Sequence, residues 1–172
     1  MRNRSNEPRR PNTHLLPTLL DRLVDNAPTT GIEVPEHYAM SASQMREVVQ
    51  RDLSWLLNTT SLEDEINRAL YPEAAASVIN YGVPPFAGTF MGTRRWEEVD
   101  RIIRRAILDF EPRLLPESLQ IVPLTPPGGE HQYNVLLFEI RGLVYMRPYP
   151  AEFMVQSSLD LETSRLQFKL RG

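Results

Sequence analysis

The stretch WEEVDRIIRRAILDFEPR, residues 96–113, decides how this chain folds. Charged pairs in acid-first order, Glu97/Arg101 and Asp100/Arg104, lie four residues apart, a spacing that stabilises a helix. The apolar residues recur at spacings of three and four. This pattern predicts an amphipathic helix with one buried stripe, made of Trp96, Val99, Ile102, Ile103, Ala106, Ile107 and Phe110.

The tripeptide Glu111-Pro112-Arg113 follows this helix and holds a carboxylate and a guanidinium two residues apart. Pro112 disfavours helical geometry at Glu111, so the helix is expected to end near Phe110. Two interpretations are open. The tripeptide is either a helix stop with two solvated charges, or a stiff corner that makes charge-assisted hydrogen bonds to a partner protein. The second interpretation predicts that Arg113→Ala leaves the monomer folded and abolishes assembly.

The composition is that of one globular domain without special chemistry. The chain has 172 residues, of which 41% are hydrophobic and 24% are charged. With 19 basic and 22 acidic residues the net charge is −3, which argues against nucleic-acid binding. There are no cysteines, so disulfides and thiolate metal sites are excluded. No apolar run approaches the roughly 20 residues that span a bilayer, so we expect a cytoplasmic protein without direct membrane insertion.

Three regions are expected along the chain. Residues 1–14 are a disordered tail, residues 15–40 are an N-terminal docking segment and linker, and residues 41–172 are one domain. Leu19, Leu20 and Leu23 follow the polar tail and precede a Pro- and Gly-containing loop. We expect these leucines to form a small docking epitope for a partner instead of core.

Helices are expected in the first part of the domain. Ser41 and Gln44 have the spacing of a capping box and begin a helix whose apolar stripe is Met45, Val48, Val49, Leu53, Leu56 and Leu57. Trp55 lies beside this stripe and is interpreted as a packing residue. A second helical region is expected over residues 62–70. A third is expected to open at Pro72 and to end near Gly82.

Strands are expected after Pro116. Residues 119–124 form a short strand, and residues 133–145 are apolar on both faces, which fits a strand covered on both sides. Gly142 is expected to mark a bulge. The polar link of residues 162–164 suggests a final hairpin. This order predicts an α+β fold, with helices from the N-terminal half packed on a small, mainly antiparallel sheet from the C-terminal half.

The last strand, residues 165–170, is expected to be an edge strand that can pair with a partner. Arg165, Gln167 and Lys169 would lie on its wetter face and discourage uncontrolled pairing. An added strand binds mainly through backbone hydrogen bonds. Replacing Gln167 by proline would therefore disrupt pairing on whichever side uses its N–H.

No catalytic, cofactor or metal site is expected. The three histidines, His14, His37 and His131, are scattered and have no ligand-spaced neighbours. The enzyme alternative is a peptidoglycan glycoside hydrolase, which needs two facing carboxylates, one of them with a raised pKa. Its candidate acids are Glu63, Glu65, Glu73, Asp109, Glu111 and Glu117. Arginines near Asp109 and Glu111 would lower these pKa values instead, so the chain is not expected to be an enzyme.

Several segments resemble those of one family when taken in order. They are Thr18–Leu23, Val48–Thr59 with the sequence VVQRDLSWLLNT, Tyr71-Pro72-Glu73 followed by Ser77–Gly82, the Glu111-Pro112-Arg113 corner, and Phe153–Ser164. Together they resemble TssE, the small baseplate protein family of bacterial type VI secretion systems, across roughly residues 15 to 170. The family is related to a wedge protein of contractile phage baseplates and includes relatives labelled lysozyme-like.

The resemblance implies a structural role in a contractile machine. The expected partners are the wedge proteins TssF, TssG and TssK, contacted through the Glu-Pro-Arg motif, and the sheath proteins TssB and TssC, contacted through the strand-rich region. The expected location is the cytoplasm, docked at the inner membrane through the baseplate. A wedge protein of a phage particle is the alternative. At Ser164-Arg165 relatives often have Ser-Gly, so a hairpin turn with positive φ is less comfortable here.

Overall fold

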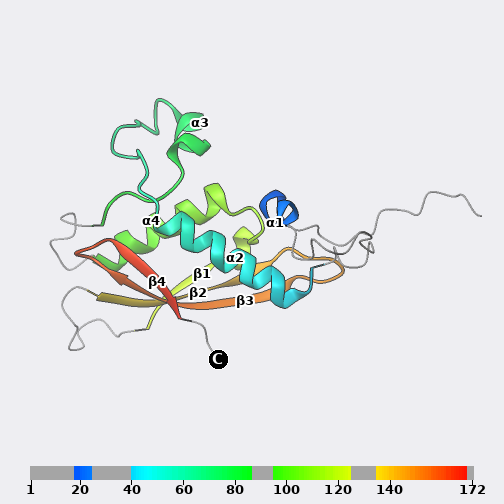
Figure 1. Ribbon diagram of the computed structural model, residues 1–172. Helices are drawn as coiled ribbons and strands as arrows, with labels where there is room; N and C mark the ends of the chain where they lie inside the picture. Colours follow the sequence, from blue (N-terminus) through cyan, green and yellow to red (C-terminus); the bar gives the residue numbers. More distant parts are fainter. Residues whose placement is uncertain (1–17, 25–39, 87–94, 125–134, 170–172) are drawn as a thin grey trace, which may run out of the picture.

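The computed structural model describes residues 18–24, 40–86, 95–124 and 135–169, and it confirms the α+β class (Figure 1). Four antiparallel strands form one sheet in chain order, so that β4 lies at an edge. They are β1 (Gln120–Pro123), β2 (Val135–Val144), β3 (Ala151–Asp160) and β4 (Arg165–Lys169). Two long helices, α2 (Ala42–Leu57) and α4 (Arg95–Phe110), pack on one face of this sheet.

Both long helices begin and pack as their sequence patterns predict. At the start of α2 the amide of Gln44 donates to the Ser41 hydroxyl at 3.3 Å, and the Ser41 amide donates to the Gln44 side chain at 2.9 Å. The core between helices and sheet is continuous, and its largest fully buried side chains include Leu53, Leu57, Ile103, Ile107, Phe138 and Ile140.

One of the two expected ion pairs on α4 differs. Arg104 pairs with Asp100 at 3.0 Å, as predicted. Arg101 pairs with Glu98, three residues away, at 3.4 Å. Both spacings bring side chains together on a helix surface, so the local sequence alone did not decide between the acids at 97 and 98.

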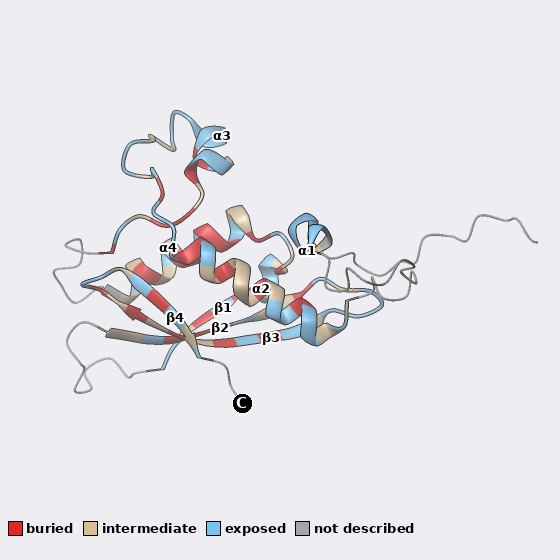
Figure 2. Cartoon of the chain, in the orientation of Figure 1, coloured by how far each residue is buried: buried red, intermediate tan, exposed pale blue. Residues whose placement is uncertain are grey.

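Two apolar features differ from expectation. β2 was expected to be covered on both sides, but both long helices lie on the same face (Figure 2). On the other face Leu137 is exposed, while Glu139 is buried. Trp55 was interpreted as a packing residue, but its side chain is 48% exposed. It lies on the flank of α2 and carries the guanidinium of Arg51 at 4.8 Å from its ring centroid. Trp96 does pack inward, with its ring 5.7 Å from that of Phe138.

Gly142 does not mark a bulge, because β2 and β3 pair without interruption from Val135↔Asp160 to Val144↔Ala151. The surrounding structure leaves room for a Cβ here, at ordinary contact distances. A Cβ at this position would meet the Leu114 side chain at 3.4 Å and the Ser118 hydroxyl at 3.5 Å, where the segment before β1 crosses β2.

Residues 61–82 form a lobe that projects away from the sheet (Figure 1). The helix expected over residues 62–70 is replaced by turns, because the Asn67 side chain accepts hydrogen bonds from the amides of Ala69 and Leu70 and so competes with helix formation. Pro72 does open a helix at its first turn, α3 (Pro72–Ala75), but this ends after one turn. The short 3₁₀ helix η2 (Val78–Asn80) follows.

The two ends of the lobe meet at a narrow neck. The Ser61 amide donates to the Val83 carbonyl at 3.0 Å, and the Val83 amide donates to the Thr59 carbonyl at 2.9 Å. Gly82 makes this approach possible. Its φ is +126°, and a Cβ there would lie 2.3 Å from the Thr59 carbonyl oxygen, a distance that no side chain tolerates.

The final hairpin forms as predicted, with no glycine in its turn. Ser164 itself adopts positive φ, at 55°. The Asp160 side chain supports the turn by accepting hydrogen bonds from the amides of Glu162, at 2.9 Å, and Thr163, at 3.3 Å. β4 then returns beside β3, with Arg165, Gln167 and Lys169 exposed and Leu166 buried, as expected.

Candidate interaction site at the end of helix α4

The Glu111-Pro112-Arg113 corner follows α4 directly. The helix ends at Phe110, as predicted from Pro112. Beyond the turn, the Tyr145 amide donates to the Arg113 carbonyl at 2.7 Å, which ties the corner to the chain just after β2. The backbone of the corner is therefore held at both sides, and its side chains project from a fixed frame.

Glu111 and Arg113 bind each other. The Glu111 side chain is buried, with 4% exposure. Nε of Arg113 donates to Oε1 of Glu111 at 2.7 Å, the Arg113 amide donates to the same oxygen at 3.1 Å, and Nη2 donates to Oε2. The interpretation of two solvated charges is therefore wrong for Glu111. Contact of this corner with a partner stays a prediction.

A third residue, Asp52 of α2, completes the corner. Nη2 of Arg113 donates to Oδ2 of Asp52 at 2.7 Å. Burial opposes the charge of Arg113, but hydrogen bonds and Coulomb attraction from Glu111 and Asp52 outweigh burial, so the pKa of Arg113 is raised above its usual value. The arginine is thus permanently charged and is clamped between two carboxylates.

The network of charges continues from α2 to the short helix α1 (Leu19–Leu23). Nε of Arg51 donates to Oδ1 of Asp52 at 2.9 Å, and its guanidinium also pairs with Asp21 of α1. The hydrogen bonds from Arg51 hold the pKa of Asp21 below its usual value. In the order of their contacts these residues are Asp21, Arg51, Asp52, Arg113 and Glu111. We call them the charge chain, because acids and arginines alternate along it.

A shallow hollow lies over the charge chain. Its apolar and aromatic lining comes from α1, α2, the residue after η2 and the end of α4, namely Leu19, Leu20, Trp55, Leu56, Tyr81 and Phe110. Tyr81 packs edge-on against Phe110, with ring centroids 5.4 Å apart. Arg113 also lines the hollow, and its buried Nη1 has no hydrogen-bond partner within the described ranges. A charged donor beside exposed aromatic surface suits recognition of another protein.

The three leucines of α1, which were predicted to form a docking epitope, are exposed. Leu19, Leu20 and Leu23 are between 50% and 74% exposed. α1 is held to α2 by the Asp21–Arg51 pair, so these apolar side chains remain turned away from the core. Docking of a partner on them stays a prediction. The expected tail of residues 1–14 lies outside the described residues.

The edge of β4 carries a contact that the sequence did not suggest. Asn58, at the C-terminal end of α2, accepts from the Leu166 amide at 2.9 Å and donates to the Leu166 carbonyl at 2.9 Å. An amide side chain thus pairs with the strand as another strand would. Leu166 directs both backbone groups away from β3, and its edge position is already occupied.

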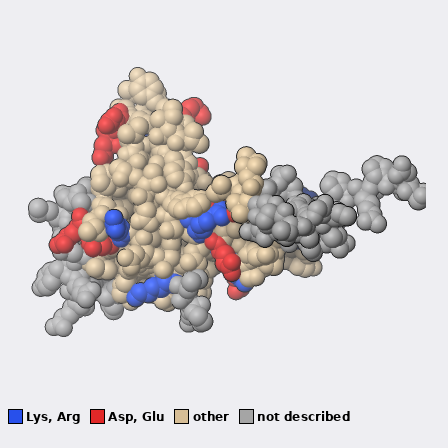
Figure 3. Space-filling model, in the orientation of Figure 1, with Lys and Arg blue, Asp and Glu red and all other residues tan. Residues whose placement is uncertain are grey.

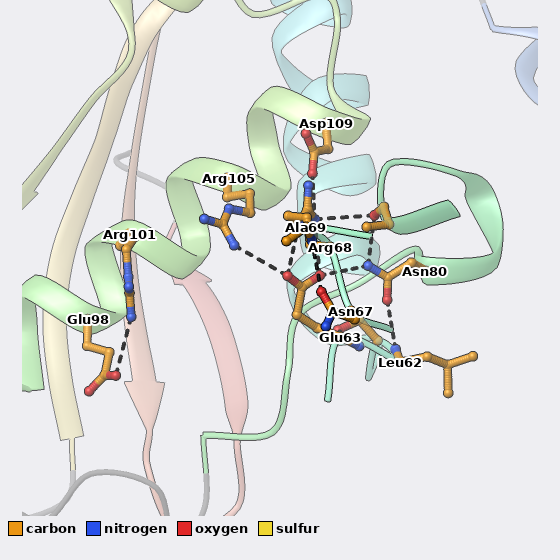
Figure 4. Close-up of polar contacts among 12 residues, drawn as sticks. Leu62, Glu63, Asn67, Arg68, Ala69, Asn80, Glu98, Arg101, Arg105 and Asp109 are labelled. Atoms are coloured by element: carbon orange, nitrogen blue, oxygen red, sulfur yellow. Dashed lines mark hydrogen bonds and ion pairs between the residues drawn. The ribbon is translucent and has the colours of Figure 1, made fainter. Parts of the chain in front are cut away.

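Three of the six acids considered for a hydrolase, Glu63, Asp109 and Glu111, occur in ion pairs. Glu63 accepts two hydrogen bonds from Arg68, both at 3.0 Å, and Arg68 also contacts Asp109 at 3.0 Å (Figure 4). These bonds hold the pKa of Glu63 below its usual value, which is opposite to what a general acid needs. The other candidates divide between the buried Glu111 and the exposed glutamates 65, 73 and 117.

Within the described ranges no group of three or more acidic, histidine or cysteine side chains could hold a metal ion. The same ranges contain no helix with the length and apolar character needed to cross a membrane. All three histidines lie outside the described residues.

Sequence reasoning missed Asp52, Arg51 and Tyr81 as parts of this site. Each lies in a segment quoted for the family resemblance, but a pattern along the chain gives no distance between α2 and α4. Asp52 is the one position where a signal existed, since an acid at the flank of an apolar stripe is available to a partner arginine.

Comparison with known proteins gives one family. The model of a family described as baseplate wedge protein gp25 matches residues 43–149, from the first turn of α2 to beyond β2. The match contains Asp52, Glu111, Pro112 and Arg113, while α1, β3 and β4 lie outside it. No curated protein and no solved structure matches the chain.

Proposed function

Because this chain belongs to the gp25 family of baseplate wedge proteins, we propose that it is the wedge subunit that joins a type VI secretion baseplate to its contractile sheath. The family is structural, and its baseplate role is the premise. The secretion machine is inferred from the ordered segments that resemble TssE, two of which, around α1 and in β3, lie outside the family match. The proposed location is the cytoplasm, docked at the inner membrane through the assembled baseplate.

The observation that carries the proposal is the clamped Arg113. A guanidinium fixed by Glu111 and Asp52, on a side chain that is still 23% exposed in the lining of the hollow, is preorganised for a charge-assisted bond to a partner. The exposed Trp55 beside it supplies the aromatic anchor that protein interfaces favour. We assign this surface to wedge partners of the TssF, TssG and TssK type.

The second proposed contact uses β4. This strand pairs with β3 on one side and forms the edge of the described sheet on the other, where Asn58 occupies the backbone groups of Leu166. An edge strand is a template for an added strand, which supports its assignment to sheath proteins of the TssB and TssC type. The charged side chains of Arg165 and Lys169 would restrict that edge to a specific partner.

A phage-type particle is the second candidate, favoured by the family match itself, since the description names a baseplate wedge and no secretion system. The two candidates place the same fold in different machines. They differ in whether the protein is needed for sheaths attached inside a living cell or is found in released particles.

Deleting the gene in its native host tests the proposal. With a fluorescently labelled TssB, sheaths should disappear in the deletion strain and return when the intact chain is expressed. Normal sheath growth in the deletion strain would overturn the secretion role. Recovery of the protein in purified released tail particles, together with unaffected sheaths, would establish the phage candidate.

A further inference from the structure

The lobe of residues 61–82 carries an apolar tip that no described part of the chain covers. Leu70, Tyr71, Val78 and Ile79 are between 61% and 83% exposed. Single exposed apolar residues are common, but four within ten positions on one projecting element are not. The first two precede α3 and the last two follow it, so the short helix holds both pairs on the same lobe.

The lobe is stiff although it is short of regular structure. Asn80 is buried and donates to Oε2 of Glu63 and to the Ala75 carbonyl, both at 2.8 Å. Arg68 joins Glu63 to Asp109 of α4, and Arg105 of α4 adds a second contact to Glu63 at 3.3 Å (Figure 4). Glu63, Arg68 and Asn80 therefore hold the lobe together from within, and the four apolar side chains are left outside.

The lobe thus has polar side chains inside and apolar side chains at its surface. Folding stability alone does not explain this arrangement. Exposed apolar side chains add no burial, while the buried Asn80 and the paired Glu63 serve to fix the shape of the lobe. A rigid loop that presents apolar surface binds without a large ordering cost.

The acidic charge of the lobe indicates which kind of surface could bind its apolar tip. The lobe contains four acids and one base, Arg68, which is engaged with Glu63 and Asp109. Asp64, Glu65 and Glu73 are exposed. Figure 3 shows acidic atoms at both sides of the projecting lobe and no basic atoms on the face in view. An acidic rim around an apolar tip disfavours a second copy of the lobe and an anionic membrane surface.

We infer that the lobe is a third docking element, which inserts its apolar tip into a recess with a Lys- and Arg-rich rim on another protein. The surface is separate from the Arg113 corner and from the β4 edge, and it rests on neither of them. The apolar tip supplies the buried centre of the interface, and the acidic rim supplies complementary charge at its border.

Photocrosslinking in cells tests the inference directly. The full chain is expressed in its host with p-benzoylphenylalanine at position 78, and crosslinked peptides are identified by mass spectrometry. The control has the same group in place of Tyr149, which is 81% exposed, in the connection between β2 and β3. We expect position 78 to crosslink to a peptide with apolar residues flanked by Lys or Arg, and position 149 not to reach that peptide. Absence of any protein crosslink at position 78, or crosslinking to an acidic peptide, would overturn the inference.

Binding to the crosslinked protein then separates tip from rim. Val78→Ser/Ile79→Ser should weaken affinity by at least roughly tenfold. Glu65→Lys/Glu73→Lys should also weaken affinity, and the affinity of this variant should depend less on salt concentration than that of the wild type. Tyr149→Ser is the matched control and should bind as the wild type does. Unchanged affinity of both double variants would overturn the inference. Flotation of wild-type protein with phosphatidylglycerol vesicles, lost in Val78→Ser/Ile79→Ser, would also overturn it in favour of a membrane contact.

Discussion

Nη2 of Arg113 lies 2.7 Å from Oδ2 of Asp52, a residue 61 positions earlier in the chain. The contact joins the C-terminal end of α4 to α2 above the sheet, and it puts Glu111, Arg113 and Asp52 in one cluster. The sequence indicates this corner through three consecutive residues. In the folded chain the corner contacts α2, and Arg51 and Asp21 extend the contacts to α1, so three segments take part.

Arg113→Ala is expected to lower stability as well as assembly. Removing the guanidinium leaves the buried Glu111 carboxylate without its partner, which costs roughly 3 kcal/mol in the free energy of unfolding. The sequence alone predicted a monomer that stays nearly intact. Urea unfolding measures the loss. Arg101→Ala is the control, since its exposed pair with Glu98 contributes about 0.5 kcal/mol or less.

A double variant separates folding from recognition at this corner. Glu111→Gln/Arg113→Gln removes both charges, leaves no buried carboxylate unpaired, and should recover part of the stability lost in Arg113→Ala. If the guanidinium is needed by a wedge partner, the double variant should still fail to copurify with it. Restored copurification with the double variant would show that Arg113 acts only inside the monomer.

Gly82→Ala is expected to destabilise the chain by about 2 kcal/mol or more. The positive φ is strained for alanine, and its Cβ would collide with the Thr59 carbonyl oxygen at the neck of the lobe. Gly142→Ala is the matched control, because it meets ordinary contacts at 3.4 Å or more. Equal denaturation midpoints for the two variants would mean that the neck is not constrained as described.

Features set by local periodicity could be predicted from the sequence. The stripe of α4, the capping box of α2, the end of α4 before Pro112 and the final hairpin each depend on residues within a few positions of one another. The family match supports the same region through residues 43–149.

Features set by distant contacts could not be predicted. Residues 62–70 have helix-forming composition, but Asn67 caps a turn and Glu63 binds Arg68 five residues away, a spacing that a helix does not bring together. Trp55 fits the edge of an apolar stripe, and only the position of Arg51 and α1 shows that it faces outward. The apolar tip of the lobe had the same ambiguity, since hydrophobic residues are ordinarily interpreted as core.

The lobe should lose stability in acid through Glu63. Its pKa is lowered because Arg68 donates to its carboxylate, so the folded state favours the charged form more than the unfolded state does. This contribution is complete above the usual value of 4.5 and is lost as the pH falls below 4.5 towards the lowered pKa. The stability difference between wild type and Glu63→Gln should therefore shrink between pH 7 and pH 3. A constant difference over this range would contradict the Glu63–Arg68 assignment.

Removing residues 1–24 should give a cooperatively folding domain that binds fewer partners. The leucines of α1 are exposed, and the Asp21–Arg51 pair that holds α1 contributes about 1 kcal/mol or less. Leu19→Ser/Leu23→Ser in the full chain should reduce partner binding without lowering the melting temperature, with Leu108→Ser on α4 as an exposed control. Loss of cooperative melting in the truncated protein would show that α1 is part of the core.

The β4 edge gives the last prediction, and the hydrogen-bond pattern determines its form. Antiparallel pairs alternate, and Leu166 directs its amide and carbonyl outward to Asn58, so Gln167 directs its own amide inward to β3. Gln167→Pro should therefore break the β3–β4 hairpin and lower stability, and it is a poor test of sheath docking.

Asn58→Ala is the sharper variant. It should cost about 1–2 kcal/mol through three lost hydrogen bonds, two with the Leu166 backbone and one to the Ser54 carbonyl, and it exposes a backbone amide and carbonyl that an incoming strand could use. If sheath proteins pair with β4 along its length, they must displace Asn58, so sheaths labelled on TssB should start at least as often in the Asn58→Ala strain as in wild type. Purified Asn58→Ala should also self-associate more in sedimentation velocity, because the edge is no longer blocked. A folded Asn58→Ala protein that stays monomeric and supports no sheath would instead make the Asn58 side chain part of the docking surface.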